Sequence, residues 1–99
     1  MLLVSILFLL PLVNANAIDL TFQWDANTEE NLAGYKIYKS DTNGETWQIV
    51  DVGNVLTYTW INCEEDRLLL FVLTAYNTDD LESSKSYGLW YNGIWLKPF

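Results

Sequence analysis

The chain has 99 residues, a formal net charge of −8 and no histidine. That length allows a single domain, and its five Lys and Arg residues are too few and too scattered for the basic patch of a nucleic-acid-binding protein. The same acidity disfavours binding to anionic membranes.

The N-terminal residues have the pattern of a secretory leader. Residues 2–13 are apolar apart from Ser5, and Ala15 and Ala17 are the small residues that a signal peptidase recognises. This pattern predicts a signal peptide over residues 1–17, cleaved before Ile18, and hence a protein that is secreted, periplasmic or held at the cell surface. The alternative is an uncleaved N-terminal anchor, although the apolar run is shorter than the roughly 20 residues of a membrane helix.

Alternating apolar and polar residues predict the first two strands. Leu20, Phe22 and Trp24 alternate with polar neighbours over residues 18–25. The polar loop DANTEEN follows, and Tyr35 and Ile37 then repeat the alternation in a second strand. A period of two indicates strands with one buried and one solvated face.

The middle of the chain predicts three more strands. A turn at residues 40–44 leads into a short strand over 46–52. Leu56, Tyr58 and Trp60 alternate with threonines in the next strand, and residues 62–66 form an acidic corner. Residues 68–73 are continuously apolar, which is typical of a central strand covered on both faces. An acidic turn at 77–82 then leads through serines into a last strand.

The C-terminal run YGLWYNGIWL contains Asn92-Gly93 between two apolar segments, which is the strongest short signal for a β-hairpin. A two-residue turn there would bring Trp90 and Trp95 into contact across the strands. The predicted pairs are Tyr91 with Ile94, Trp90 with Trp95, and Leu89 with Leu96.

These segments resemble a fibronectin type III domain over roughly residues 18–90. The B strand of that family ends in Leu-x-Val-x-Trp and its C strand is Gly-Tyr-x-Val-x-Tyr. The matching residues here are Leu20, Phe22 and Trp24, then Gly34, Tyr35 and Ile37. Tyr58-Thr-Trp60 and Phe71-Val-Leu73-Thr-Ala75-Tyr76 are similar to the E and F strands, and WDANTEENLAGYKIY looks like secreted bacterial and phage-borne members.

The resemblance implies an all-β, immunoglobulin-like sandwich in which strands B and E face strands C, C′, F and G. Strand A is expected to be short or missing, because the leader runs almost into strand B. The domain is expected over residues 18–91, with residues 92–99 as the return strand of an additional aromatic hairpin. The expected structural core is Leu20, Phe22, Trp24, Tyr35, Ile37, Tyr58, Trp60, Phe71, Leu73 and Ala75.

Catalysis and metal binding have few candidates. Without histidine there is no Ser–His or Cys–His pair and no common zinc site, so we expect no enzyme, no catalytic residue and no cofactor.

Two loops place oxygen donors at alternate positions, as calcium sites do: Asp25, Asn27 and Glu29, and Asp41, Asn43 and Glu45. Neither has the EF-hand pattern, and turns favour Asp and Asn for their own reasons. Solvated turn residues are the favoured interpretation, and no metal site is predicted.

The single cysteine, Cys63, replaces an apolar position of the family and is interpreted as a small buried hydrophobe. A disulfide to another molecule is the alternative.

The aromatic tail supplies the candidate binding residues, which are Trp90, Tyr91, Trp95 and Phe99. They would form a platform for a protein or a carbohydrate, or alternatively would cover the sandwich edge left by the missing strand. The resemblance implies a non-catalytic secreted binding or adhesion module that acts through loops or through this hairpin. The alternative is a structural subunit or spacer that self-associates through the hairpin as a homo-oligomer.

Overall fold

The computed structural model describes residues 17–64, 67–86, 88–91 and 96–98. These residues form strands and no helix, so none of them belongs to a helix able to cross a membrane. The strands are β1 (Ala17–Gln23), β2 (Leu32–Ser40), β3 (Gln48–Gly53), β4 (Thr57–Glu64), β5 (Leu69–Asn77), β6 (Leu89–Tyr91) and β7 (Leu96–Pro98).

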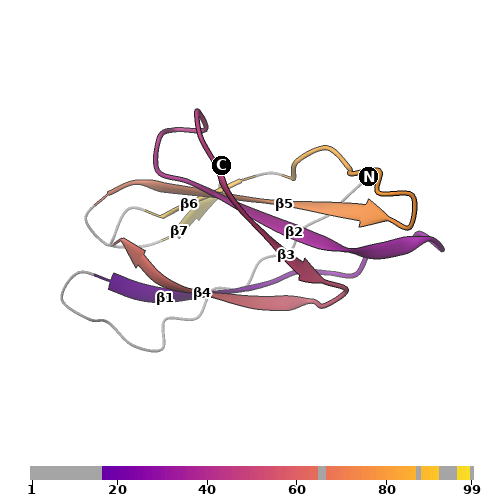
Figure 1. The fold of residues 1–99 in the computed structure, drawn as a ribbon. Coiled ribbons are helices and arrows are strands. Elements are labelled where there is room, and N and C mark those ends of the chain that lie inside the picture. The colour runs from indigo at the N-terminus through magenta and orange to yellow at the C-terminus, as the bar shows by residue number, and fades with distance from the viewer. Residues whose placement is uncertain (1–16, 65–66, 87, 92–95, 99) are drawn as a thin grey trace.

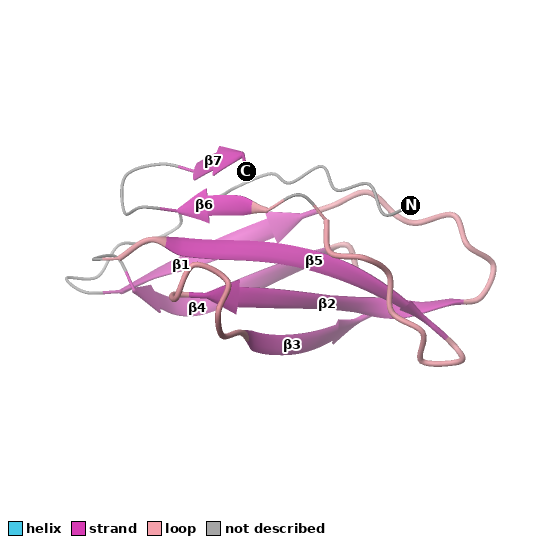
Figure 2. Ribbon diagram, turned by 90° about the horizontal axis from the view of Figure 1, so that it is seen from above, coloured by secondary structure: helices cyan, strands magenta, loops and turns pink. Residues whose placement is uncertain are grey.

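The strands form two antiparallel sheets that face each other (Figure 1). One sheet contains β1 and β4, and the other has the order β3-β2-β5-β6-β7 (Figure 2). This arrangement confirms the predicted all-β sandwich with its C-terminal hairpin. Within the described residues β1 pairs with β4 alone, so the first strand of the expected sandwich is missing there.

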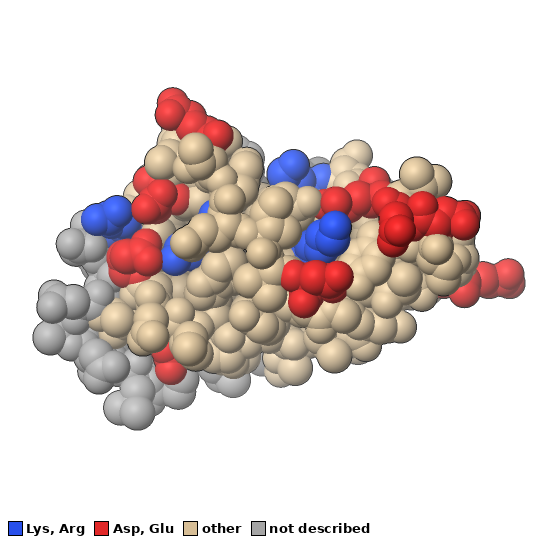
Figure 3. Space-filling model, in the orientation of Figure 1, with Lys and Arg blue, Asp and Glu red and all other residues tan. Residues whose placement is uncertain are grey.

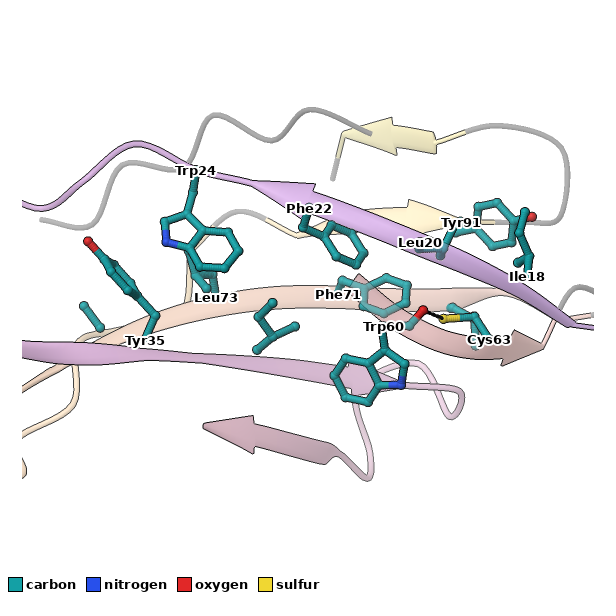
Figure 4. Close-up of a cluster of buried hydrophobic side chains, with 13 residues drawn as sticks. Ile18, Leu20, Phe22, Trp24, Tyr35, Trp60, Cys63, Phe71, Leu73 and Tyr91 are labelled. Carbon is teal, nitrogen blue, oxygen red and sulfur yellow. Dashed lines mark hydrogen bonds between the residues drawn. The ribbon is translucent and has the colours of Figure 1, made fainter. Parts of the chain in front are cut away.

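The hydrophobic core lies between the two sheets (Figure 4). Phe71 of β5 is central to it, because its ring centroid lies 4.7 Å from that of Phe22 and 6.0 Å from that of Trp60. Each large aromatic ring removes on the order of 150–250 Å² from water, which a domain this small needs for stability. All the residues expected in the core are buried except Tyr58, which is half-buried and packs against the others.

An ion pair with a buried lysine joins the sheets near one end. The ammonium group of Lys39 lies 2.9 Å from a carboxylate oxygen of Glu64 and 5.5 Å from the centroid of the Trp60 ring. Lys39 is 5% exposed, and its charge is compensated by both neighbours, as a buried cation requires.

β4 extends into the predicted corner, as far as Glu64, and contains a bulge. Ile18 pairs with Cys63 but Leu20 pairs with Trp60, so two residues of β4 oppose Asp19. One of the two is Asn62, which has a φ of 58°. Its N–H donates to the Asp19 carboxylate at 3.0 Å, and asparagine tolerates this left-handed conformation better than most residues.

The hairpin exists, but its predicted register is wrong. Tyr91 pairs with Leu96, Trp90 with Lys97, and Leu89 with Pro98, which shifts the expected pairing by two residues. A shift of two keeps every side chain on the same face of the sheet, so the hydrophobic pattern does not distinguish the two registers. The expected Asn92-Gly93 turn and the Trp90–Trp95 contact lie outside the described residues.

Candidate binding surface

The four aromatic residues predicted to bind a partner do not share one surface. Tyr91 is 2% exposed and belongs to the core, beside Ile18 and Leu20 (Figure 4). Trp90 is half-buried and packs against a second cluster, on the other face of the same sheet. Adjacent residues of a strand point to opposite faces, so Trp90 and Tyr91 are separated by the sheet. Trp95 and Phe99 lie outside the described residues.

That second cluster occupies part of the outer face of the five-stranded sheet, the face turned away from the core. It contains Tyr38 from β2 and Leu70 and Val72 from β5, with Trp47 and Trp90 packed against them; we call these five residues the aromatic face. Tyr38 pairs with Val72, and Leu70 pairs with Trp90. Cross-strand neighbours on one face are in direct reach of each other, so the apolar surface is continuous over β2, β5 and β6.

Gly88 allows the aliphatic part of the aromatic face to pack tightly. A Cβ atom at position 88 would lie 2.7 Å from Leu70 Cδ1 and 3.3 Å from Val72 Cγ1. A side chain there would displace Leu70, because Cβ contacts below 3.0 Å do not occur without a shift, and would press tightly on Val72. Glycine therefore lets Leu70 and Val72 extend over the neighbouring strand.

Lys85, from the loop between β5 and β6, covers the aromatic end of the face. Its ammonium nitrogen lies 4.9 Å from the Tyr38 ring centroid and 5.9 Å from that of Trp47. The two rings meet edge to face, with centroids 5.9 Å apart. Cation–π attraction of this kind contributes about 0.5–1 kcal/mol at an exposed site, so Lys85 is held close to the rings.

A carboxylate organises the polar half of the same sheet face. Glu82 accepts hydrogen bonds from the hydroxyls of Tyr38 and of Thr74, the latter at 2.7 Å, and forms an ion pair with Lys36 at 3.5 Å. Desolvation by burial raises the pKa of Glu82, but these hydrogen bonds and the lysine charge outweigh it, and the pKa is lowered. Burial, and then the bond to Glu82, raises the pKa of Tyr38. Glu82 is therefore a satisfied carboxylate and not a free acid.

A second tyrosine–carboxylate pair follows along the same sheet. The Tyr76 hydroxyl donates to Asp51 Oδ1 at 2.8 Å. This hydrogen bond lowers the pKa of Asp51 and raises that of Tyr76. The polar groups of this surface are thus paired with one another.

Other parts of the described chain offer little for chemistry. These residues hold no group of three or more His, Cys, Asp or Glu side chains placed to bind a metal. Two of the loop carboxylates considered as oxygen donors have protein partners: Glu29 accepts a hydrogen bond from Asn27 Nδ2 at 3.0 Å, and Asp41 pairs with Arg67 at 3.2 Å. Cys63 is fully buried, as expected, and burial raises the pKa of its thiol to about 12.

The core contains a small cavity lined by apolar side chains, among them Phe22, Trp24 and Ile37. Its volume of about 10 Å³ is far below the roughly 300–1,000 Å³ of a small-molecule site.

Most of the aromatic face was not identified as a site from sequence. The available signal was the continuous apolar run at residues 68–73, which indicates a strand covered on both faces. Phe71 and Leu73 face the core, whereas Leu70 and Val72 face outward. The residues that cover them, Trp47 and Trp90, are distant in sequence and come together only through the sheet.

Comparisons with known proteins agree on the fold. No protein-family model and no curated protein matches the chain. Similar solved structures include a myokine structure, with a TM-score of 0.62 and 16% identity over 85% of this chain and 88% of the other. They also include the third fibronectin type III domain of the human KIAA0343 protein, with a TM-score of 0.64 and 15% identity over 86% and 76%. Identities this low show the fold alone, which is the immunoglobulin-like sandwich of fibronectin type III domains.

Proposed function

We propose that this chain is a non-catalytic, secreted binding module that engages a partner protein through its aromatic face. The fold is one that serves as a binding or structural module. The observation that carries the proposal is the clustering of Trp47 and Trp90 with Leu70 and Val72 on the solvent side of a sheet. Tryptophan and tyrosine are enriched among the residues that dominate binding energy at interfaces.

A protein suits this surface better than a glycan. A sugar site needs polar groups that are free to bind ligand hydroxyls beside the rings. Here Glu82 and Asp51 already accept hydrogen bonds from tyrosine hydroxyls. Trp47 and Trp90 are half-buried and offer ring surface to apolar side chains of another protein, whereas Leu70 and Val72, each 7% exposed, support these rings from beneath.

The N-terminal pattern supports secretion. The apolar residues 2–13 and the small residues Ala15 and Ala17 favour cleavage before Ile18. The sequence of residues 24–38, WDANTEENLAGYKIY, resembles those of secreted bacterial and phage-borne fibronectin type III domains, which favours such an origin for this chain. The intact mass of the secreted protein tests the leader, and a product that still begins at Met1 would contradict it.

Site-specific photo-crosslinking tests the binding face. A photoreactive phenylalanine replaces Trp47 in one protein and Ile61 in the other; Ile61 is 62% exposed on β4, in the opposite sheet. We expect an extracellular protein to crosslink at position 47 only. The purified partner should then bind Trp47→Ser at least about 30-fold more weakly, as expected for a hot-spot residue, and should bind Ile61→Ser normally. Binding to a glycan array without any protein partner would contradict the choice of ligand.

A second candidate is a structural subunit that self-associates through the C-terminal hairpin. It is favoured by the position of β7, which is an edge strand of the larger sheet among the described residues, and edge strands present unpaired backbone groups to other chains. Light scattering at several concentrations, with and without residues 92–99, tests it. Loss of association on truncation would support this candidate.

A further inference from the structure

The turn after β5 presents an apolar side chain next to two acidic ones. Leu81 is 68% exposed, and the neighbouring Asp79 and Asp80 are also exposed; we call these three residues the acidic tip. Figure 3 shows acidic side chains clustered at one end of the visible face and others at the opposite end. An exposed leucine within an acidic turn is costly to solvate and is available for contact with another surface.

The acidic tip is held in one conformation. The side-chain oxygen of Asn77 accepts hydrogen bonds from the N–H groups of Asp79 at 2.9 Å and Leu81 at 3.0 Å. The backbone of Asn77 also bonds to Leu81 O and to the Asp80 N–H, both at 3.0 Å. A rigid tip loses little conformational entropy on docking.

The aromatic face carries a complementary cation. Among the described residues, Lys36, Lys39 and Arg67 each pair with a carboxylate. In that same part of the chain, Lys85 contacts two rings of the aromatic face and forms no ion pair. An apolar surface with a cation at its rim favours a ligand that combines an apolar side chain with a carboxylate.

We propose that the acidic tip of one copy docks on the aromatic face of a second copy, with Leu81 against the rings and the tip carboxylates beside Lys85. This inference rests on the proposed function, because it names the partner of the aromatic face. Both complementary surfaces belong to the same chain. In a molecule of net charge −8, this contact brings the tip carboxylates to Lys85, while the Glu82 carboxylate beside the same face is already bonded to the Tyr38 hydroxyl and paired with Lys36.

Charge reversal on each side of the contact tests the proposal. Lys85→Glu alters the face and Asp80→Lys alters the tip, and each should weaken self-association at least about tenfold, because like charges then meet. An equimolar mixture of the two variants should recover association, since each reversed residue finds its opposite in the other chain. Arg67→Glu is the matched control: it makes the same charge change as Lys85→Glu away from the face and should weaken association far less. Leu81→Ser should also abolish association.

Sedimentation velocity of the wild type and variants over a wide concentration range gives the result, and thermal melting checks that each variant is folded. A wild type that stays monomeric at all concentrations would overturn the inference, as would an Arg67→Glu effect equal to that of Lys85→Glu. Neither result affects whether a different protein crosslinks at position 47. The sedimentation experiment therefore tests self-association, and the crosslinking experiment tests the proposed function independently.

Discussion

Trp24 places a large ring and an N–H group without a hydrogen bond at the same buried position. It is 4% exposed, its ring lies 5.6 Å from that of Tyr35, and its Nε1 has no partner among the described atoms. Ring packing is favourable, whereas an unsatisfied buried donor costs about 1–3 kcal/mol. Loss of the ring should therefore lower the free energy of unfolding, whereas removal of the N–H group alone should raise it.

We expect Trp24→Ala to destabilise the domain by about 3–5 kcal/mol, as other large-to-small core changes do. That loss is enough to prevent folding of a domain of ordinary stability. Trp24→Phe keeps an aromatic ring and removes the unpartnered N–H, so its cost should be about 1 kcal/mol. Urea denaturation followed by circular dichroism measures both, and equal losses would contradict the burial of Trp24.

Cys63 should behave as an inert thiol in the folded state. It is fully buried, its Sγ donates to Trp60 O at 3.4 Å, and its pKa of about 12 keeps it protonated at neutral pH. Iodoacetamide at pH 8 should leave the folded protein unmodified and alkylate it completely in denaturant. Mass spectrometry distinguishes the two states, and rapid labelling without denaturant would contradict this environment.

Glu82 predicts an acid-dependent loss of stability. Its folded-state pKa lies below the ordinary value of 4.5, so its contribution is present above about pH 4.5 and disappears as the pH falls through the lowered value. Because the group is partly exposed, the contribution at pH 7 is only about 1 kcal/mol. Glu82→Gln should therefore cost stability at pH 7 and almost none near pH 3. A cost that does not change with pH would show that the carboxylate charge is not involved.

At the scale of the elements, alternation identified the strands that pack into the core, because burial of one face imposes a period of two. It placed Leu20, Phe22 and Tyr35 in the core and indicated that β5 is covered on both faces. It failed for the register of β6 and β7, where a shift of two residues leaves the pattern unchanged. Alternation gives no information on the ion pair between Lys39 and Glu64. Such contacts depend on how the strands are placed in space and not on the local pattern of residues.

Contact between β2, β3 and β5 depends on the absence of a side chain at Gly34. A Cβ atom there would lie 2.6 Å from the Tyr76 hydroxyl oxygen and 2.9 Å from the backbone carbon of Gly53. Gly34→Ala should cost about 1–3 kcal/mol, as other overpacked sites do.

Gly88→Ala is the matched comparison for this change. Its closest contact, at 2.7 Å, is a side-chain methyl group of Leu70 and not a backbone atom, so we expect a smaller loss. Thermal unfolding of both variants gives the order, and a larger loss at Gly88 would contradict the packing around Gly34.

At the scale of the whole molecule, the two sheets differ in width and in the side chains on their outer faces. The narrow sheet has outward-facing threonines, and Thr21 and Thr59 hydrogen-bond across it at 2.8 Å. The wide sheet carries the aromatic face, Lys85 and the Glu82 network. Partner contacts should therefore concentrate on the wide sheet. Thr59→Lys should leave both partner binding and self-association unchanged, as surface plasmon resonance and sedimentation can show.

The unequal sheets also determine how the molecule opens. β5 has a strand on each side and apolar residues on both faces, whereas β1 and β4 are hydrogen-bonded within the described chain only to each other. The backbone amides of β5 should therefore exchange with deuterium only through global unfolding, while those of β1 and β4 exchange through a smaller, separate opening. Both sheets contribute to one core, so β1 and β4 should be the part of the sandwich that exchanges first and β5 the part that exchanges last.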